Sequence, residues 1–205
     1  MKDLENTDDL DLFNTNAMED LRNWLTTKTL CGHSHKSSFL YYDKQLWLPL
    51  KRTIESINKR ANKSIEELEL LSCCYTGELF RIQNYNENKR AHIFPLGRYQ
   101  SWCTEDGLDV LSKTGGCVLL IRGHASPEDC AIKTMELMFY LKPEISGLLF
   151  SGKHELSRYI KEHEVVMPIK KPNIDSVYIV ESKHLAEWRS FAEPLKQEKW
   201  FRNNW

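Results

Sequence analysis

The spacing of apolar residues changes once along the chain, near residue 74, and no other feature limits the fold as much. Before this point apolar residues recur at the spacing of an amphipathic helix, as at Leu50, Ile54 and Ile57. Beyond it, short apolar runs alternate with polar turns, which is typical of strands. The sequence therefore predicts an α+β fold, with a helical segment over residues 1–74 and a mostly β core over residues 75–205.

The first segment is expected to be helical. One or two acidic amphipathic helices are expected up to Leu25, because residues 1–24 carry seven acidic and two basic side chains. A further helix is expected over residues 46–61. Another begins at Ser64, because Ser64 and Glu67 have the spacing of a capping box.

In the second segment, six apolar runs predict strands and three other stretches predict helices. Pro127, which follows Ser126, suits the first turn of the longest of these helices. The expected strands are residues 79–83, 99–102, 117–122, 147–150, 164–169 and 177–180, and the expected helices are residues 106–111, 127–141 and 184–191.

The composition excludes several classes of protein. The 205 residues are 41% hydrophobic and 28% charged, so the chain is neither disordered nor fibrous. No apolar run reaches the ~18 residues of a membrane span, and the acidic first residues fit neither a secretory signal nor a transit peptide. We therefore expect a cytoplasmic monomer without a membrane partner.

The six cysteines do not form a disulfide pattern. Cys73 and Cys74 are adjacent and the others show no paired spacing, so we expect free thiols in a reducing compartment. The one cluster that resembles a metal site is the CGHSH run at residues 31–35. It lacks a second pair of ligands at the spacing of a zinc site, so a loop without a metal is the preferred interpretation.

Three short segments, in chain order, support a functional hypothesis. In the segment GELFRI, Arg81 lies within an apolar strand, and in YQSWCTED, Ser101 precedes a short helix. In KEHEVVMP, Glu162 and Glu164 precede an apolar run that ends in proline. Together these segments resemble the arginine, serine and Glu-x-Glu signature of mono-ADP-ribosyltransferases, which share a fold with clostridial binary toxins.

The resemblance covers residues 75–180 and implies both a fold and an activity. It implies N-terminal helices followed by a split antiparallel β-sandwich that binds NAD+ as substrate and needs no metal. The helical segment is similar to that of the small ADP-ribosyltransferases of T-even-type phages, which implies an effector that modifies host proteins in the host cytoplasm. The implied reaction transfers ADP-ribose from NAD+ to a target protein, with arginine as the acceptor because both glutamates are present.

The resemblance also implies a role for each motif residue. Glu164 holds the ribose 2′-hydroxyl and faces the positive charge that develops on the ribose. Glu162 is the base for the acceptor, and strand geometry places it on the same face as Glu164, ~6.6 Å away. Ser101 orients Glu164, and Arg81 binds the NAD+ pyrophosphate with a fork of donors. The other cofactor-binding residues are Phe80, Ile82, Trp102 and Thr104, of which Ile82 stands where the family usually has glycine.

The chemistry explains why a carboxylate is needed. Cleavage of the nicotinamide–ribose bond passes through an oxocarbenium-like ribose, as glycoside hydrolysis does. Nicotinamide leaves without a general acid, so the enzyme must supply a negative charge beside the developing cation. A carboxylate about 4 Å from a unit charge contributes about 4 kcal/mol at an effective dielectric constant of 20, which is roughly a thousandfold in rate.

Other interpretations remain open. The same motifs would serve an NAD+ glycohydrolase, or transfer to a nucleic-acid base if the basic pairs at residues 51–52 and 59–60 form a local patch. The net charge of −1 disfavours nucleic acid. An inactive binding or inhibitor protein would use Trp188, Trp200 and Trp205 as an interface. Each motif also has an ordinary structural interpretation, since an arginine on a strand is commonly a surface residue with a buried stem.

Overall fold

The structure, a computed structural model, describes residues 17–25, 41–93, 97–111, 115–145 and 157–201. All the described elements before residue 73 are helical, as the sequence predicts. The helical elements are a helix at residues 17–25, η1 (Asp43–Trp47), α3 (Leu48–Asn58), α4 (Ile65–Ser72), η2 (Glu105–Gly107), α5 (Leu108–Leu111), η3 (Pro127–Asp129), α6 (Thr134–Leu141), η4 (Pro143–Ile145), η5 (Ser157–Glu162), η6 (Lys171–Asn173), η7 (Ser182–Glu187), α8 (Trp188–Phe191) and η8 (Gln197–Lys199).

Eight strands form one antiparallel sheet, so the α+β class is confirmed. Their order is β1-β5-β6-β3-β2-β4-β7-β8. Five of the predicted strands are confirmed, and the sixth, residues 147–150, lies outside the described residues. The strands are β1 (Cys74–Tyr75), β2 (Gly77–Asn84), β3 (Tyr99–Cys103), β4 (Cys117–Ala125), β5 (Ala131–Lys133), β6 (Glu164–Pro168), β7 (Ile174–Glu181) and β8 (Glu193–Pro194).

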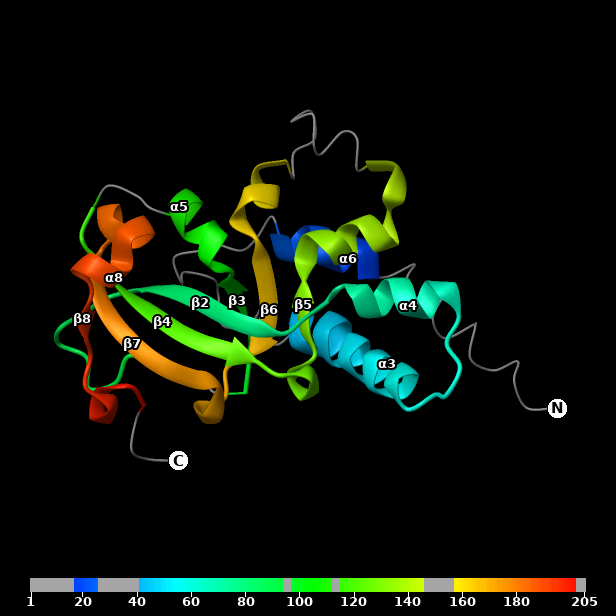
Figure 1. The fold of residues 1–205 in the computed structure, drawn as a ribbon, viewed down its shortest axis with the longest axis horizontal. Helices are drawn as coiled ribbons and strands as arrows, with labels where there is room; N and C mark the ends of the chain where they lie inside the picture. The colour runs from blue at the N-terminus through cyan, green and yellow to red at the C-terminus, as the bar shows by residue number, and fades with distance from the viewer. Residues whose placement is uncertain (1–16, 26–40, 94–96, 112–114, 146–156, 202–205) are drawn as a thin grey trace.

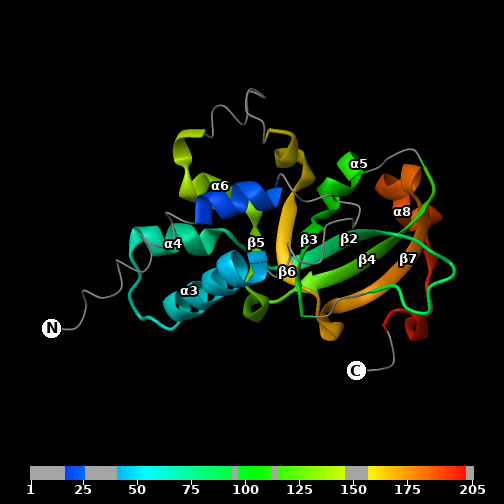
Figure 2. The same ribbon diagram turned by 180° about the vertical axis from the view of Figure 1, so that it is seen from behind.

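The helices of the first segment cover one end of the sheet. In both views α3, α4 and α6 gather beside β5 and β6, whereas α5 and α8 lie toward the opposite end (Figures 1 and 2). The helix at residues 17–25 lies beside α6 in both views. One hydrophobic cluster joins these elements, because it contains Trp24, Leu50, Met138 and Val166. The helical segment and the β core therefore share part of their interior.

One helix of the first segment begins at the local signal that the sequence offers. The hydroxyl of Ser64 accepts a hydrogen bond from the backbone N–H of Glu67 (3.1 Å), and the Glu67 carboxylate accepts one from the backbone N–H of Ser64 (2.8 Å). These bonds form the predicted capping box of α4. α3 follows η1 without a break, and Pro49 lies where the π-helical turn passes into the α-helix.

The single helix predicted over residues 127–141 is wrong. Pro127 begins only η3, and Cys130 then adopts a left-handed conformation with a φ of 48°. β5 follows and pairs with both β1 and β6, so α6 begins only at Thr134. In a short buried strand the spacing of apolar residues does not distinguish the strand from a helix. β5 is recognised only by its pairing with two strands that are distant in the sequence.

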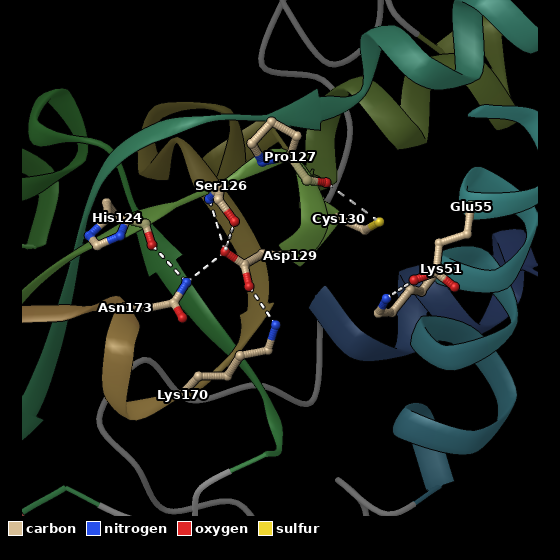
Figure 3. A network of polar contacts seen from close by, with 9 residues as sticks. All are labelled: Lys51, Glu55, His124, Ser126, Pro127, Asp129, Cys130, Lys170 and Asn173. Carbon is tan, nitrogen blue, oxygen red and sulfur yellow. Dashed lines mark hydrogen bonds and ion pairs between the residues drawn. The ribbon is translucent and has the colours of Figure 1, made fainter. Parts of the chain in front are cut away.

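Asp129 fixes this turn to the segment between β6 and β7 (Figure 3). Its Oδ2 accepts hydrogen bonds from the backbone N (2.9 Å) and hydroxyl (2.8 Å) of Ser126 and from Asn173 Nδ2 (2.6 Å). Its Oδ1 pairs with Lys170 Nζ at 2.5 Å. Burial alone would raise the pKa of Asp129, but these donors, led by the Lys170 ammonium, outweigh it and lower the pKa from 3.8 to about 2. The cluster therefore joins the segment between β4 and β5 to the segment between β6 and β7.

The pairing between β2 and β3 involves fewer residues than any other strand pairing described in the sheet. β2 pairs with β4 along its whole length, but it pairs with β3 only through Phe80 and Cys103. The sequence predicts a split sandwich, whereas the eight strands form one continuous sheet. The nearest feature to a split is this single residue pair between β2 and β3.

Candidate active site

The three motif segments lie on three neighbouring strands in the centre of the sheet. Arg81 is on β2, Ser101 is on β3, and Glu164 is the first residue of β6. These strands are adjacent in the order β6-β3-β2, and the register places Cys103 opposite both Phe80 and Glu164. Segments that are far apart in the sequence therefore meet in one part of the sheet.

The Arg81 guanidinium bridges β2 and β3 where their pairing ends. Its Nη1 donates to the backbone oxygen of Ser101 (2.6 Å), and its Nη2 donates to Gln100 Oε1 (2.8 Å). With the Gln83 amide oriented to satisfy its neighbours, Arg81 Nε donates to the Gln83 oxygen at 3.1 Å. Burial lowers the pKa of Arg81 to about 10, against the opposing effect of the nearby Glu164 charge. Two of the five N–H donors therefore have no partner among the described residues.

The Glu164 carboxylate is 3% exposed and accepts hydrogen bonds from two helices. Thr134 Oγ1, at the start of α6, donates to its Oε2 at 3.0 Å. Trp24 Nε1, on the helix at residues 17–25, donates to its Oε1 at 3.4 Å. The hydrogen bond expected from Ser101 is not found within the described part of the chain, where Ser101 lies opposite Val166 rather than Glu164. Ser101 contributes its backbone oxygen to Arg81 instead.

Glu162 and Glu164 do not share a strand face, contrary to the prediction. Glu162 ends η5, His163 adopts a left-handed conformation with a φ of 45°, and β6 begins only at Glu164. Both glutamates are buried, and Glu162 is 8% exposed. The spacing of residues along a strand does not apply to this pair, because the turn at His163 separates them.

The turn at Glu162 and His163 packs against the short helix that follows β3. The backbone N–H of Thr104 donates to the backbone oxygen of His163 at 3.3 Å. A Cβ atom at Gly107 would lie 2.4 Å from the backbone oxygen of Glu162, so only glycine fits at this position. The second and third motif segments are therefore in contact outside the strands as well.

The four residues predicted to contact the cofactor lie in different environments. Phe80 and Trp102 are buried in two different hydrophobic clusters. Ile82 and Thr104 are only partly buried. Of these four side chains, only those of Ile82 and Thr104 are partly exposed, and the Thr104 hydroxyl is itself buried without a hydrogen-bond partner among the described residues.

Three residues that contact the motif residues are not expected from the sequence, namely Trp24, Gln100 and Thr134. Thr134 lies within the stretch that was predicted as one long helix, and Trp24 belongs to the apolar stripe of the first helix, so neither gives a local signal. Gln100 does give one, because a polar side chain within a buried strand commonly has a polar partner. Its partner here is Arg81.

The described residues contain no candidate metal site. No group of three or more His, Cys, Asp or Glu side chains among them is arranged to hold a metal ion, and the CGHSH cluster at residues 31–35 lies outside them. The five described cysteines are free thiols. Within the same ranges, no helix has the length and apolar character needed to cross a membrane.

A buried glutamate and a partly buried arginine thus lie on neighbouring parts of one sheet. A carboxylate in such a position stabilises a cation that develops beside it, and a guanidinium with two remaining donors binds a phosphate oxygen pair. Comparison with known protein families, with curated proteins and with solved structures gives no match to this chain. The site is therefore interpreted from its own chemistry.

Proposed function

We propose that the chain is an NAD+-dependent mono-ADP-ribosyltransferase, which moves ADP-ribose onto a protein side chain, with arginine as the acceptor, and releases nicotinamide. The supporting observation is that Arg81, Ser101 and Glu164 occupy three neighbouring strands. In the family that the motifs resemble, the arginine lies on the first strand of the core, and the serine strand leads into a short helix. β3 agrees with this pattern, because η2 and α5 follow it directly, and Arg81 lies on β2, which follows the two-residue strand β1.

The reaction needs a negative charge beside the ribose, and Glu164 is the residue proposed to supply it. The bond between the ribose C1 and the nicotinamide nitrogen breaks, and its electron pair leaves with nicotinamide. The acceptor nitrogen then attacks C1, and Glu162 takes the proton that the acceptor loses. Glu162 ends η5, before β6, and is 8% exposed, so in this role the acceptor side chain must reach it through the turn at His163.

Arg81 is proposed to bind the pyrophosphate of NAD+. Its bonds to Ser101 and Gln100 fix the plane of the guanidinium, and its two remaining donors can then meet a phosphate without a loss of side-chain freedom. NAD+ bound in this way would lie along the boundary between strands β2 and β3, with its nicotinamide ribose toward Glu164. The resemblance to ADP-ribosyltransferases supports the assignment of this activity. If the chain is encoded by a phage, its targets would be host proteins.

The test uses purified protein, a bacterial lysate and NAD+ labelled in its adenylate part. A labelled protein band, with the modified residue identified by mass spectrometry, is the expected result. Free labelled ADP-ribose without a labelled protein would indicate a glycohydrolase, and labelled nucleic acid would indicate a base as acceptor. If the folded protein releases no nicotinamide from NAD+ in any of these mixtures, the proposal is wrong and a binding role takes its place.

A further inference from the structure

The two oxygens of the Glu164 carboxylate have partners on two separate elements. Oε2 accepts from Thr134 at 3.0 Å, and Oε1 accepts from Trp24 at 3.4 Å. The side chains of Thr134 and Trp24 are both buried, with exposed fractions of 0% and 2%. Glu164 is therefore covered from two directions, by residues that are far from it in the sequence.

Thr134 is fixed to the strand that carries Glu164. It is the first residue of α6 and directly follows β5, whose Lys133 pairs with Val165 of β6. A movement of Thr134 away from Glu164 would break this strand pairing. The hydroxyl of Thr134 therefore stays with the carboxylate while other parts of the molecule move.

The helix that carries Trp24 is not joined to the strand of Glu164 by strand pairing, whereas Thr134 directly follows a strand that is. Trp24 packs edge-on against the rings of Tyr42 and Trp47, with centroid distances of 5.6 Å and 5.1 Å. These are contacts between helices, and no strand pairing joins residues 17–25 to the sheet. Its hydrogen bond, at 3.4 Å, is longer than the usual range of about 2.7–3.2 Å. The helix itself is firmly packed, because Leu21, Trp24 and Leu25 are 0–2% exposed in one hydrophobic cluster, but the indole of Trp24 can turn away from Glu164 without breaking a strand pairing.

We propose, on the premise of the function proposed above, that the two oxygens of Glu164 have different tasks. Thr134 is a positioning residue that orients the carboxylate throughout the reaction. Trp24 occupies the oxygen that the ribose 2′-hydroxyl takes when NAD+ binds, so its indole turns away from Glu164 to admit the substrate. Glu164 is only 3% exposed, so a covering group must move before its carboxylate can meet a ribose.

The first arm of the test concerns Thr134. Thr134→Val keeps the shape of the side chain and removes the hydroxyl, so we expect kcat for nicotinamide release to fall by about tenfold or more with KM changed by less than about twofold. Thr134→Ser restores the hydroxyl and should recover most of kcat. A Thr134→Val protein with normal kcat would overturn the positioning role.

The second arm compares two neighbouring tryptophans. Trp24→Phe keeps an aromatic ring and removes the N–H that competes with the ribose, so KM for NAD+ should fall by about threefold or more. Trp47→Phe is the matched control, because Trp47 is equally buried and its indole nitrogen has no hydrogen-bond partner among the described residues. A fall in kcat in Trp24→Phe alone, without a change in KM, would mean that Trp24 positions Glu164, and would overturn the proposal.

The third arm needs no NAD+ and separates this inference from the function on which it rests. A water-soluble carbodiimide with a glycine ester labels accessible carboxylates, and peptide mass spectrometry reports the label at Glu164. We expect Trp24→Ala to label at least about fivefold faster than the wild type, whereas Glu19→Ala, at an exposed position of the same helix, should not. If this pattern appears but nicotinamide is never released, the covering contact stands and NAD+ is the wrong substrate. If wild-type Glu164 labels as fast as in Trp24→Ala while nicotinamide is released, the inference fails and the function stands.

Discussion

Asp129 and Glu164 are buried almost equally, yet their surroundings differ. The donors to Asp129 come from the turn and connection next to it and include the Lys170 ammonium (Figure 3). The donors described for Glu164 are the neutral groups of Trp24 and Thr134, on two helices. Asp129 pairs directly with an ammonium, whereas Glu164 accepts hydrogen bonds from neutral groups of two helices and interacts electrostatically with the nearby Arg81 guanidinium.

This difference separates a structural carboxylate from one arranged for chemistry. When one partner of a buried ion pair is removed, an uncompensated charge remains, and stability falls. A carboxylate oriented by neutral donors keeps its interaction with a cation that arrives with the substrate. Substitutions at Asp129 should therefore lower stability, and substitutions at Glu164 should lower activity.

Asp129→Asn is expected to have the largest effect of the variants that sharpen this comparison. The pKa of Asp129 falls from 3.8 to about 2 in the folded protein, so loss of the charge should lower the free energy of unfolding by about 2 kcal/mol at pH 7. Because the folded-state pKa is depressed, this contribution is complete above about pH 4 and is lost as the pH falls toward about 2. Urea unfolding of both proteins at pH 7 and at pH 3 measures it.

Asp175→Asn is the matched control for this experiment. Asp175 pairs with His124 at 3.0 Å beside the same cluster, but both side chains are exposed, so the expected loss is under about 0.5 kcal/mol. Equal stability of the two variants would contradict the structural role of Asp129. A folded Asp129→Asn protein that no longer releases nicotinamide would show that the two carboxylates are not separate in function.

Arg81→Lys is expected to weaken NAD+ binding by about tenfold. An ammonium cannot keep the bonds to Ser101 and Gln100 and also offer two parallel donors to a phosphate. Titration calorimetry measures the affinity, and thermal melts report whether the β2–β3 connection still forms. Unchanged affinity in a folded variant would remove Arg81 from the proposed NAD+ site.

Ser101→Ala is expected to have the smallest effect, less than about threefold in kcat. Its hydroxyl makes no hydrogen bond to Glu164 in the described part of the chain, and its backbone oxygen, which binds Arg81, remains. The resemblance alone would predict a larger loss. A loss of tenfold or more in steady-state nicotinamide release would mean that Ser101 orients Glu164 in the working enzyme, in conflict with the role of Thr134.

The parts of the fold that could be predicted depend on local signals. The capping box at Ser64, the short helix after β3 and five of the strands follow from spacing within a few residues. The 127–141 segment could not be predicted, because β5 is defined by its pairing with β1 and β6. The left-handed turn at His163 is equally hidden, since no glycine marks it.

The candidate site divides in the same way. Arg81, Ser101 and Glu164 are recognisable because each belongs to a short motif, and the sheet brings their strands together. Thr134 and Trp24 carry no motif, and they reach Glu164 only through the packing of α6 and of the helix at residues 17–25. Contacts of this kind depend on the tertiary structure and are invisible to spacing arguments.

The central claim, that Glu164 is the carboxylate that faces the ribose cation, is tested most directly by one paired measurement. Nicotinamide release and transfer of label to an acceptor protein are recorded for Glu164→Gln, Glu162→Gln and the control Glu105→Gln, whose carboxylate is exposed and bound to Arg189. Glu164→Gln should lose roughly a thousandfold in nicotinamide release, with or without an acceptor. Glu162→Gln should lose label transfer but keep slow NAD+ hydrolysis, because water can still trap the cation. Equal loss of both activities in the two variants, or no loss in Glu164→Gln, would contradict the claim.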